Sequence, residues 1–276
     1  MTDWLSLHDL CHRYGDGSVG LSACSLGIRR GTRNALLGAN GSGKTTLLQH
    51  INGLLKPTAG TVQFDGRPLD YSRAGLAALR RRVGLVFQNP DRQLLSANVL
   101  EAVSFGPLTL GLDLARVRDR VAEALTAVGL QAYGERPAHQ LSFGQKKRVC
   151  IAGVLAMQPE LLLLDEPMAG LDAGMQADLL ELLDRLVAQG ITVLLTTHDV
   201  DFAYRWADTL HLLADGRCLG SFPADELPAH AEHLASAGQP LPSVIRLHRQ
   251  LVARGQLPAD TRPRSLDQLL AALGEP

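Results

Sequence analysis

One short stretch, Gly38 to Thr45, constrains the fold of this chain more than any other. It matches the pattern G-x-x-x-x-G-K-[ST], in which a glycine-rich loop cradles phosphate groups. Several backbone N–H groups can point at one phosphate only where the chain turns tightly, and glycine permits that turn. Residues 34–37 are typical of a buried strand, and residues 45–51 are typical of a helix whose positive dipole end would face the phosphates. The stretch therefore predicts a nucleotide-binding loop between a strand and a helix.

Two side chains of this loop have separate predicted roles. Lys44 would reach the β- and γ-phosphates of a nucleotide, and the Thr45 hydroxyl would bind Mg²⁺. A chance glycine-rich turn is the alternative interpretation, and features further along the chain argue against it. The candidate nucleotide-binding residues of this region are Gly38, Ala39, Asn40, Gly41, Ser42, Gly43, Lys44, Thr45 and Thr46.

Composition excludes several classes of protein. The 276 residues suit one large α/β domain, or one domain with an appendage. Basic and acidic residues number 27 and 28, so no basic surface for nucleic acid is expected. The four cysteines are scattered without a C-x-x-C pair, which favours a reduced compartment. No signal peptide and no apolar run of about 20 residues is evident, so any membrane part would come from partners.

A polar residue follows one of the predicted strands. Residues 83–87 are typical of a buried strand, and Gln88 stands at its end. Ligands of open parallel sheets gather at the carboxyl ends of strands, so Gln88 could contact Mg²⁺ or a water molecule. A surface-loop glutamine is an equally good interpretation. Earlier in the chain, residues 4–14, 25–28 and 61–64 predict strands, and residues 73–82 predict a short basic helix.

The chain changes character between about residues 91 and 158, where the pattern predicts an inserted helical subdomain. Asn98 followed by Glu101 resembles a helix capping box. Gly106, Pro107 and Gly111 are expected to break this region. A second helix is predicted from about Leu114 to Val128, with an apolar face of period 3.6.

A third helix is predicted after the sequence Leu141 to Gln145, and Ser142 is a good N-cap for it. Three basic residues, Lys146 to Arg148, follow in its first turn. Cations at a helix N-terminus oppose the helix dipole, and a cap alone does not require Gly144. An anion is therefore expected near this helix.

Two carboxylates end the most apolar strand. Residues 161–164 are four leucines, and Asp165 and Glu166 follow them. Paired acids at the mouth of a buried strand are costly unless a cation and a water molecule share the site. Asp165 would hold Mg²⁺ through water, and Glu166 would polarise the attacking water. Another buried strand, residues 191–195, leads to His198, which would lie at the same edge of the sheet.

The rest of the chain continues the α/β pattern and then departs from it. A helix is predicted over about residues 174–188, and residues 209–213 and 217–221 predict a hairpin around the Asp215–Gly216 turn. Composition shifts near Pro223, and residues 243–252 and 265–273 are amphipathic helical stretches. We therefore expect one domain over residues 1–222 and a helical C-terminal extension over residues 223–276.

Taken in order along the chain, these motifs resemble the ATP-binding subunits of ABC transporters. More narrowly, residues 87–94, 104–107 and 141–149 are similar to the energy-coupling-factor group, and within it to the cobalt-uptake ATPases. Four residues differ from those that are frequent in the family, namely Ala39, Arg92, Met168 and Ala173. These differences affect the assignment of the cargo more than the assignment of the chemistry. The resemblance rests on Tyr14, residues 38–45, Gln88, residues 141–145, Asp165, Glu166, residues 170–172 and His198.

The resemblance implies a fold and a chemistry. The fold would be a RecA-like α/β core of the P-loop NTPase type, with an antiparallel β subdomain and the helical insertion. ATP and Mg²⁺ would be the cofactors, with Thr45, Gln88 and Asp165 at the metal and Glu166, His198 and Gln88 in the catalytic set. Tyr14 would stack on adenine, a role that the resemblance favours over that of a half-buried strand residue.

The resemblance also implies partners. Two copies would work face to face, so that Ser142, Gly144 and Gln145 of one copy face the ATP of the other. A homodimer is the first expectation, with a heterodimer left open. An integral membrane coupling subunit and a substrate-binding membrane subunit would complete an importer, with this chain peripheral on the cytoplasmic face of the membrane.

Other functions remain as alternatives at this point. The cargo could be cobalt, nickel or a vitamin. A soluble ABC ATPase of DNA repair or translation would usually carry two cassettes or a coiled coil, and this chain has neither. A regulatory binder without hydrolysis would be expected to lack Glu166 or His198, and both are present.

Overall fold

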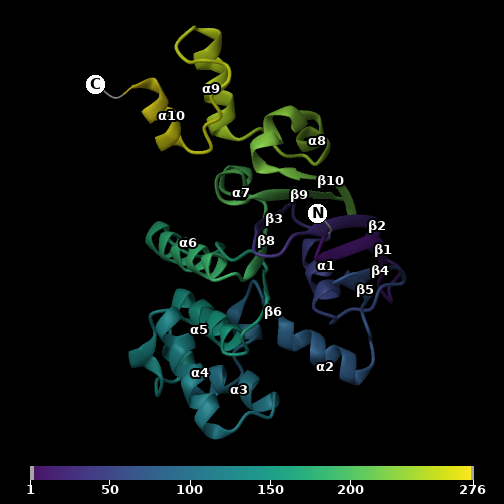
Figure 1. Ribbon diagram of the computed structural model, residues 1–276, viewed down its shortest axis with the longest axis vertical. Coiled ribbons are helices and arrows are strands. Elements are labelled where there is room, and N and C mark those ends of the chain that lie inside the picture. The colour runs from purple at the N-terminus through teal and green to yellow at the C-terminus, as the bar shows by residue number, and fades with distance from the viewer. Residues whose placement is uncertain (1–2, 275–276) are drawn as a thin grey trace.

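A six-stranded sheet forms the centre of the computed structural model, which describes residues 3–274 (Figure 1). The strands from β9 to β6 run parallel, and β10 pairs antiparallel with β9 at the edge. Adjacent parallel strands end at the same edge, which brings distant segments of the chain together. In spatial order the strands are β10 (Arg217–Pro223), β9 (Thr209–Ala214), β3 (Arg33–Leu37), β8 (Thr192–Thr197), β7 (Leu161–Leu164) and β6 (Val83–Val86).

A second, antiparallel sheet confirms the expected β subdomain. Its order is β2 (Val19–Ile28), β1 (Leu5–Arg13), β4 (Ala59–Phe64) and β5 (Arg67–Pro68). The expectation that strand structure begins at residue 25 was wrong, since β2 already begins at Val19. Asp9 and Ala23 have positive φ of 46° and 49°, and the register of β1 against β2 shifts near them. These bulges disturb the period-2 pattern that marks a strand in sequence.

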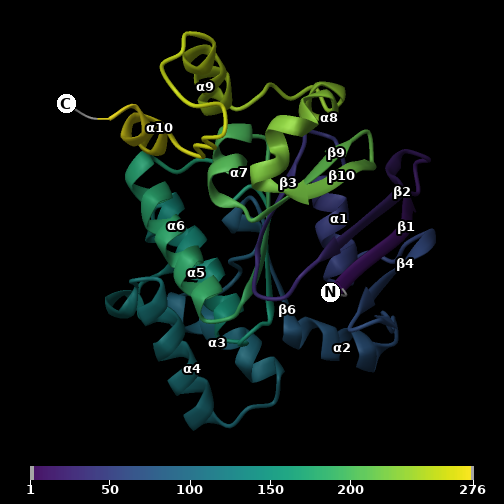
Figure 2. The same ribbon diagram turned by 45° about the horizontal axis from the view of Figure 1, so that its top comes forward.

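Helix α1 (Lys44–Ile51) lies between the two sheets and joins their cores (Figures 1 and 2). Alternate residues of each central strand point to opposite faces. Leu36, Leu163 and Leu194 pack in one cluster with the apolar residues of α1 and of the antiparallel sheet. Their neighbours in sequence face the other cluster, which includes residues of α5 (Phe143–Leu155), α6 (Ala173–Ala188) and α7 (Val200–Trp206). The central strands are therefore apolar on both faces, as their sequences predict.

The expected helices between β6 and β7 are present at one end of the molecule (Figures 1 and 2). They are α3 (Val99–Thr109), α4 (Leu114–Ala127) and α5 (Phe143–Leu155). The expected break at Gly106 and Pro107 was wrong, because α3 continues through both residues. A Cβ at Gly106 would lie 2.7 Å from Met157 Cγ, so this glycine allows close packing of α3 near the end of α5.

The C-terminal helices lie at the opposite end of the molecule in both views (Figures 1 and 2). Helices α9 (Ser243–Ala253) and α10 (Leu266–Leu273) confirm the two predicted amphipathic stretches. Helix α2 (Arg73–Arg82) confirms the predicted short basic helix. The 3-10 helix η4 (Ala224–His230) and α8 (Ala231–Ser236) precede them; the shorter 3-10 helices are η1 (Pro90–Arg92), η2 (Gln131–Tyr133) and η3 (Ala138–Gln140). Across residues 3–274, no helix has both the length and the apolar character to cross a membrane.

His211 on β9 is a fully buried titratable group of the central sheet. Its Nε2 lies 3.3 Å from Asn34 Oδ1, and its Nδ1 lies 2.7 Å from Ser221 Oγ. The amide oxygen of Asn34 can only accept, so Nε2 carries the proton and Nδ1 accepts from the Ser221 hydroxyl. Burial lowers the pKa of His211 to about 4. The folded protein therefore holds this ring neutral.

This burial predicts how stability depends on pH. The folded-state pKa lies below the unfolded value, so the stabilisation is complete above the ordinary pKa of 6.5 and is lost as pH falls towards 4. The loss should approach about 3 kcal/mol for this single group. His211→Gln, which cannot titrate, should show a shallower fall in the free energy of unfolding between pH 6.5 and pH 4 in urea titrations. His139→Gln, at an exposed histidine, is the control, and equal pH slopes in all three proteins would refute the prediction.

Candidate nucleotide-binding site

The phosphate loop leaves β3 and enters α1, as predicted, and two of its glycines are required by their surroundings. A Cβ at Gly38 would lie 2.3 Å from Leu213 O. Gly43 has a φ of 104°, and a Cβ there would lie 2.6 Å from Gly20 O. Both distances are far below van der Waals contact, so neighbouring backbone leaves room for glycine alone. The loop consequently turns tightly enough to aim backbone N–H groups at one point.

Lys44 is buried and folds back over this loop. Its Nζ donates to Gly38 O at 2.8 Å and to Ala39 O at 3.0 Å, and it lies 3.4 Å from Glu166 Oε1. A buried ammonium group requires compensation by acceptors and opposite charge. The loop carbonyls and one carboxylate supply it at the position where a phosphate chain would bring much more negative charge.

Thr196, at the end of β8, joins the two predicted acids. Its hydroxyl donates to Asp165 Oδ1 at 2.7 Å and accepts from the backbone N–H of Glu166 at 2.8 Å. The Thr45 hydroxyl donates to the other oxygen, Asp165 Oδ2, at 2.7 Å. Thr196 was not predicted as a site residue. The signal available in the sequence was its place next to the end of a buried strand, the same rule that selected His198.

Glu166 is held in a strained conformation between Lys44 and His198. Its φ is 45°, a region that costs a non-glycine residue about 1–3 kcal/mol. Its Oε2 lies 3.0 Å from His198 Nδ1, and its buried Oε1 makes no hydrogen bond. The described structure therefore brings together Lys44, Glu166 and His198, which are far apart in sequence.

Lys44 and Glu166 line a cavity of about 410 Å³ together with other predicted residues, whereas His198 contacts Glu166 but does not line the cavity. Tyr14 lies on its rim with its hydroxyl 2.7 Å from Thr46 Oγ1, and its ring meets the His12 ring edge-on at 4.5 Å. Gln88 is exposed and lines the same cavity, as predicted. Val19 and Gly20, which sequence reasoning missed, also line it. The other lining residues are Asn40, Gly41, Gly43, Lys44, Thr45, Thr46, Asp165 and Glu166.

The remaining predicted residues do not line this cavity. Ser142 caps α5 in a reciprocal box, in which its Oγ accepts from Gln145 N at 3.3 Å and its N–H donates to Gln145 Oε1 at 3.0 Å. Gly144 packs against α6, where a Cβ would lie 2.6 Å from Met175 Sδ. One copy of the chain thus does not bring Ser142, Gly144 and Gln145 to its own phosphate loop.

The basic run that follows Ser142 finds its partners within the chain. Lys146 pairs with Asp91 at 2.7 Å, and Arg148 pairs with Asp178 at 2.6 Å. The expected anion near this helix is therefore present as two carboxylates, and the basic residues no longer argue for a phosphate there. Lys147 is buried, which lowers its pKa to about 8, although the charges of Cys150 and Glu166 act in the opposite direction.

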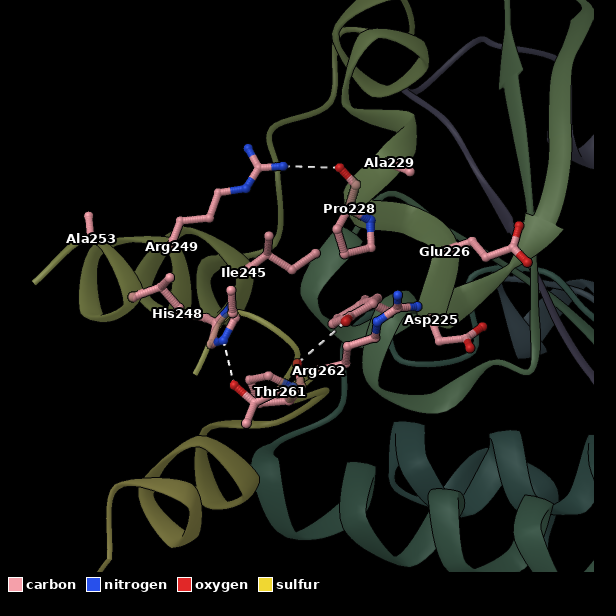
Figure 3. A pocket seen from close by; sticks show the side chains of 14 residues that line it. Asp225, Glu226, Pro228, Ala229, Ile245, His248, Arg249, Ala253, Thr261 and Arg262 are labelled. Atoms are coloured by element: carbon pink, nitrogen blue, oxygen red, sulfur yellow. Dashed lines mark hydrogen bonds between the residues drawn. The ribbon is translucent and has the colours of Figure 1, made fainter. Parts of the chain in front are cut away.

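A larger cavity of about 750 Å³ lies elsewhere, between η4, α9 and the loop before α10 (Figure 3). Several of its polar groups already have partners: Arg249 donates to Pro228 O at 3.0 Å, and His248 Nε2 lies 2.7 Å from Thr261 Oγ1. None of the predicted site residues lines it. The smaller cavity at the phosphate loop is therefore the candidate functional site.

Comparisons with known proteins show which family the chain belongs to. A family model described as ABC transporter matches residues 21–169. The energy-coupling factor transporter ATP-binding protein EcfA of Methanocaldococcus jannaschii is 44% identical over 252 residues, which cover 91% of this chain and 90% of that protein.

Solved structures give the same result. The structure of cbiO1 from Clostridium perfringens, described as part of the ABC transporter complex cbiONQ, is 40% identical with a TM-score of 0.77, covering 92% of this chain and 100% of that one. A dimeric ATP-binding cassette in a post-hydrolysis state, bound to ADP and Pi, is 30% identical with a TM-score of 0.72, covering 80% and 98%.

The chain belongs to the ABC transporter family of ATPases. It is the ATP-hydrolysing subunit of an energy-coupling-factor transporter, a membrane-associated complex in which such ATPases act as dimers with membrane subunits. The expected P-loop NTPase fold is thereby confirmed.

The position of Thr196 predicts a measurable effect on catalysis. Thr196→Val keeps the shape of the side chain but removes both hydrogen bonds that orient Asp165 and Glu166. Each lost bond is worth about 1 kcal/mol, so kcat for ATP hydrolysis should fall by roughly 10-fold. Thr192→Val is the matched control, because Thr192 is equally buried on the same strand and its hydroxyl accepts from Gly31 N at 2.9 Å, away from the two acids. Equal kcat values for the two variants would contradict the role of Thr196.

Proposed function

We propose that this chain hydrolyses Mg²⁺–ATP at the phosphate-loop cavity, in a face-to-face pair with a second copy, to drive uptake of cobalt ions. The observation that supports the chemistry is the meeting of Lys44, Asp165, Glu166 and His198 at one edge of the central sheet. Lys44 and the two acids are more than 100 residues apart in the sequence, so it is the fold that brings them together.

The nucleotide would be held chiefly by the loop itself. The backbone N–H groups of Gly38 to Thr46 would surround the phosphates, and Lys44 would exchange its carbonyl partners for phosphate oxygens. Tyr14 would stack its exposed ring on adenine, oriented by Thr46 and the edge of His12. These contacts fix the phosphates in front of Glu166.

The residues present also fit Mg²⁺. The Thr45 hydroxyl and the Asp165 carboxylate already lie 2.7 Å apart, and hydroxyl, carboxylate and amide oxygens are ligands that Mg²⁺ prefers. Thr45, Asp165 and Gln88 would hold the ion, with Asp165 acting through water. When bound, the ion would offset the negative charge of the phosphates.

Glu166 would act as the general base for the attacking water. Glu166 lines the cavity, and its buried Oε1 makes no hydrogen bond but lies 3.4 Å from Lys44 Nζ, so it would be free to accept from a water molecule once Lys44 binds the phosphates. His198 and Thr196 fix the rest of the residue. A carboxylate set in advance at the reacting centre loses little free energy to reorganisation during the reaction. His198 would orient Glu166 and hold a proton beside it.

This role predicts the effect of Glu166→Gln. The amide keeps the size of the side chain but cannot take a proton from water, so turnover should slow by about 10²-fold or more. Equilibrium binding of ATP should be retained, because the phosphate loop and Lys44, which would hold the phosphates, are unchanged. Steady-state hydrolysis and nucleotide binding should be measured on the same preparation, and full activity of the variant would remove Glu166 from the mechanism.

The second copy would supply Ser142, Gly144 and Gln145 to each ATP. Their place at the start of a helix, away from the cavity of their own chain, supports this arrangement.

Exposed apolar side chains on the helical insertion, among them Leu95, Phe105 and Leu114, support docking of an integral membrane coupling subunit on the cytoplasmic face. A substrate-binding membrane subunit would complete the importer, and a homodimer is proposed over a heterodimer.

Cobalt is proposed because residues 104–107 and 141–149 most resemble those of the cobalt-uptake ATPases. The likeness to cbiO1 of Clostridium perfringens supports the same group. Nickel and vitamins are the alternative cargoes, and a soluble ABC ATPase outside transport is less well supported. An ATPase that drives a partner subunit need not touch the cargo, so the ATP site itself does not discriminate among them.

The cargo can be tested in cells. Deleting this protein should abolish high-affinity uptake of labelled Co²⁺ and leave uptake of amino acids and sugars unchanged. Complementation with the wild-type chain should restore uptake, and complementation with Glu166→Gln should not, which ties the effect to hydrolysis. Loss of vitamin or Ni²⁺ uptake with Co²⁺ uptake intact would reject cobalt and leave the transport class in place.

A further inference from the structure

Lys147 is a buried cation that the proposed chemistry leaves without a role. Its side chain is 2% exposed, although lysine is rarely buried unless it is paired. Its Nζ donates to Pro167 O at 2.7 Å and to Ala169 O at 3.0 Å, and within residues 3–274 no carboxylate lies within 4 Å of it. Burying an ammonium group among carbonyls adds little net stability. Its position therefore calls for an explanation other than stability.

The backbone that Lys147 binds comes directly after Glu166. Residues 167–171 join β7 to α6, and their carbonyl groups are held from two sides. Gln176 Nε2 donates to Leu171 O at 3.1 Å, but Gln176 belongs to the helix that this segment itself enters. Of these two donors, Lys147 and Gln176, it is Lys147 that reaches the segment from a separate helix, α5. It therefore fixes the exit of Glu166 against a different part of the fold.

The other end of this contact is the start of α5. Lys147 lies just over one turn after Ser142, and its Nζ lies 5.2 Å from the centre of the Phe143 ring. That ring covers Gly170, where a Cβ would lie 2.9 Å from it. Gly144 and Met175 make the similar close contact described above. The start of α5 and residues 167–175 are thus in close contact at two glycines, so a shift of one is transmitted to the other.

We propose that Lys147 is a positioning residue, which ties the Ser142 end of α5 to the backbone that carries Glu166. This inference rests on the proposed function, in which Ser142 and Glu166 of one copy act on different ATP molecules. Lys147 then connects the two ATP sites of the dimer through each chain, so that closure around one ATP sets the base at the other.

The first experiment measures hydrolysis. Lys147→Met keeps the length and apolar stem of the side chain but leaves two buried carbonyls without a donor. We expect kcat to fall by at least about 10-fold, with less than about 3-fold change in the dissociation constant for ATP. Lys146→Met is the matched control on the same helix, because it loses only the ion pair with Asp91, and its kcat should stay near the wild-type value.

The second experiment measures closure of the dimer without hydrolysis. In a Glu166→Gln background, ATP-dependent dimerisation is followed by light scattering. Adding Lys147→Met should weaken dimerisation by about 10-fold, since the Ser142 end of α5 loses its support, and adding Lys146→Met should not. If Lys147→Met does not fold, Lys147→Gln, whose amide still reaches one carbonyl, replaces it in both assays.

The outcomes separate this inference from the function on which it rests. If Glu166→Gln hydrolyses ATP at the wild-type rate, the proposed catalytic role fails. If Glu166→Gln is slow but Lys147→Met turns over and dimerises like the wild type, the role of Lys147 fails. Slow turnover of Lys147→Met with normal dimerisation would also overturn it, because only the Glu166 side would then depend on Lys147.

Discussion

The buried charge of Lys44 is the constraint on which the site depends. An ammonium group removed from water must be surrounded by acceptors, and here these are Gly38 O, Ala39 O and Glu166 Oε1. The two carbonyls require the tight glycine turn, and the carboxylate requires β7 to end beside β3 with only β8 between them. A phosphate chain completes this set rather than disturbing it, since it adds negative charge where a cation is already fixed. The glycine turn, the strand order and nucleotide binding thus all meet one electrostatic requirement.

Much of this arrangement could be predicted from sequence because it depends on local patterns. The phosphate loop, the leucine strand before Asp165 and the amphipathic helix α4 each follow from residues adjacent in the chain. The meeting of Glu166 with His198 also followed, because parallel strands end at one edge. Contacts between distant segments could not be predicted in this way. In the sequence alone, Thr196 is one more threonine in a strand, and Lys147 is one of three basic residues on a helix.

The helix that begins at Ser142 illustrates a second limit. Within one chain, Ser142 and Gln145 satisfy each other in a capping box, and this needs no ligand. The bond from Gln145 N to Ser142 Oγ is 3.3 Å long, whereas strong bonds of this kind are nearer to 2.9 Å. A long cap bond is easily exchanged for a phosphate oxygen. The start of α5 can therefore be stable within its own chain and still be able to bind the ATP of a second copy.

The strained backbone of Glu166 connects these points. A φ of 45° costs about 1–3 kcal/mol, and it persists only where the surroundings determine it fully. Thr196 holds the N–H of Glu166, and Lys147 holds the carbonyl of the next residue, Pro167. Restrained on both sides, the backbone fixes the carboxylate whose buried Oε1 makes no hydrogen bond and lies 3.4 Å from Lys44 Nζ. The strain is the cost of fixing that oxygen before the nucleotide arrives, and the two restraints come from β8 and α5. In the proposed mechanism, catalysis at Glu166 would therefore depend on how these two elements pack, which would extend the site well beyond the residues that touch ATP.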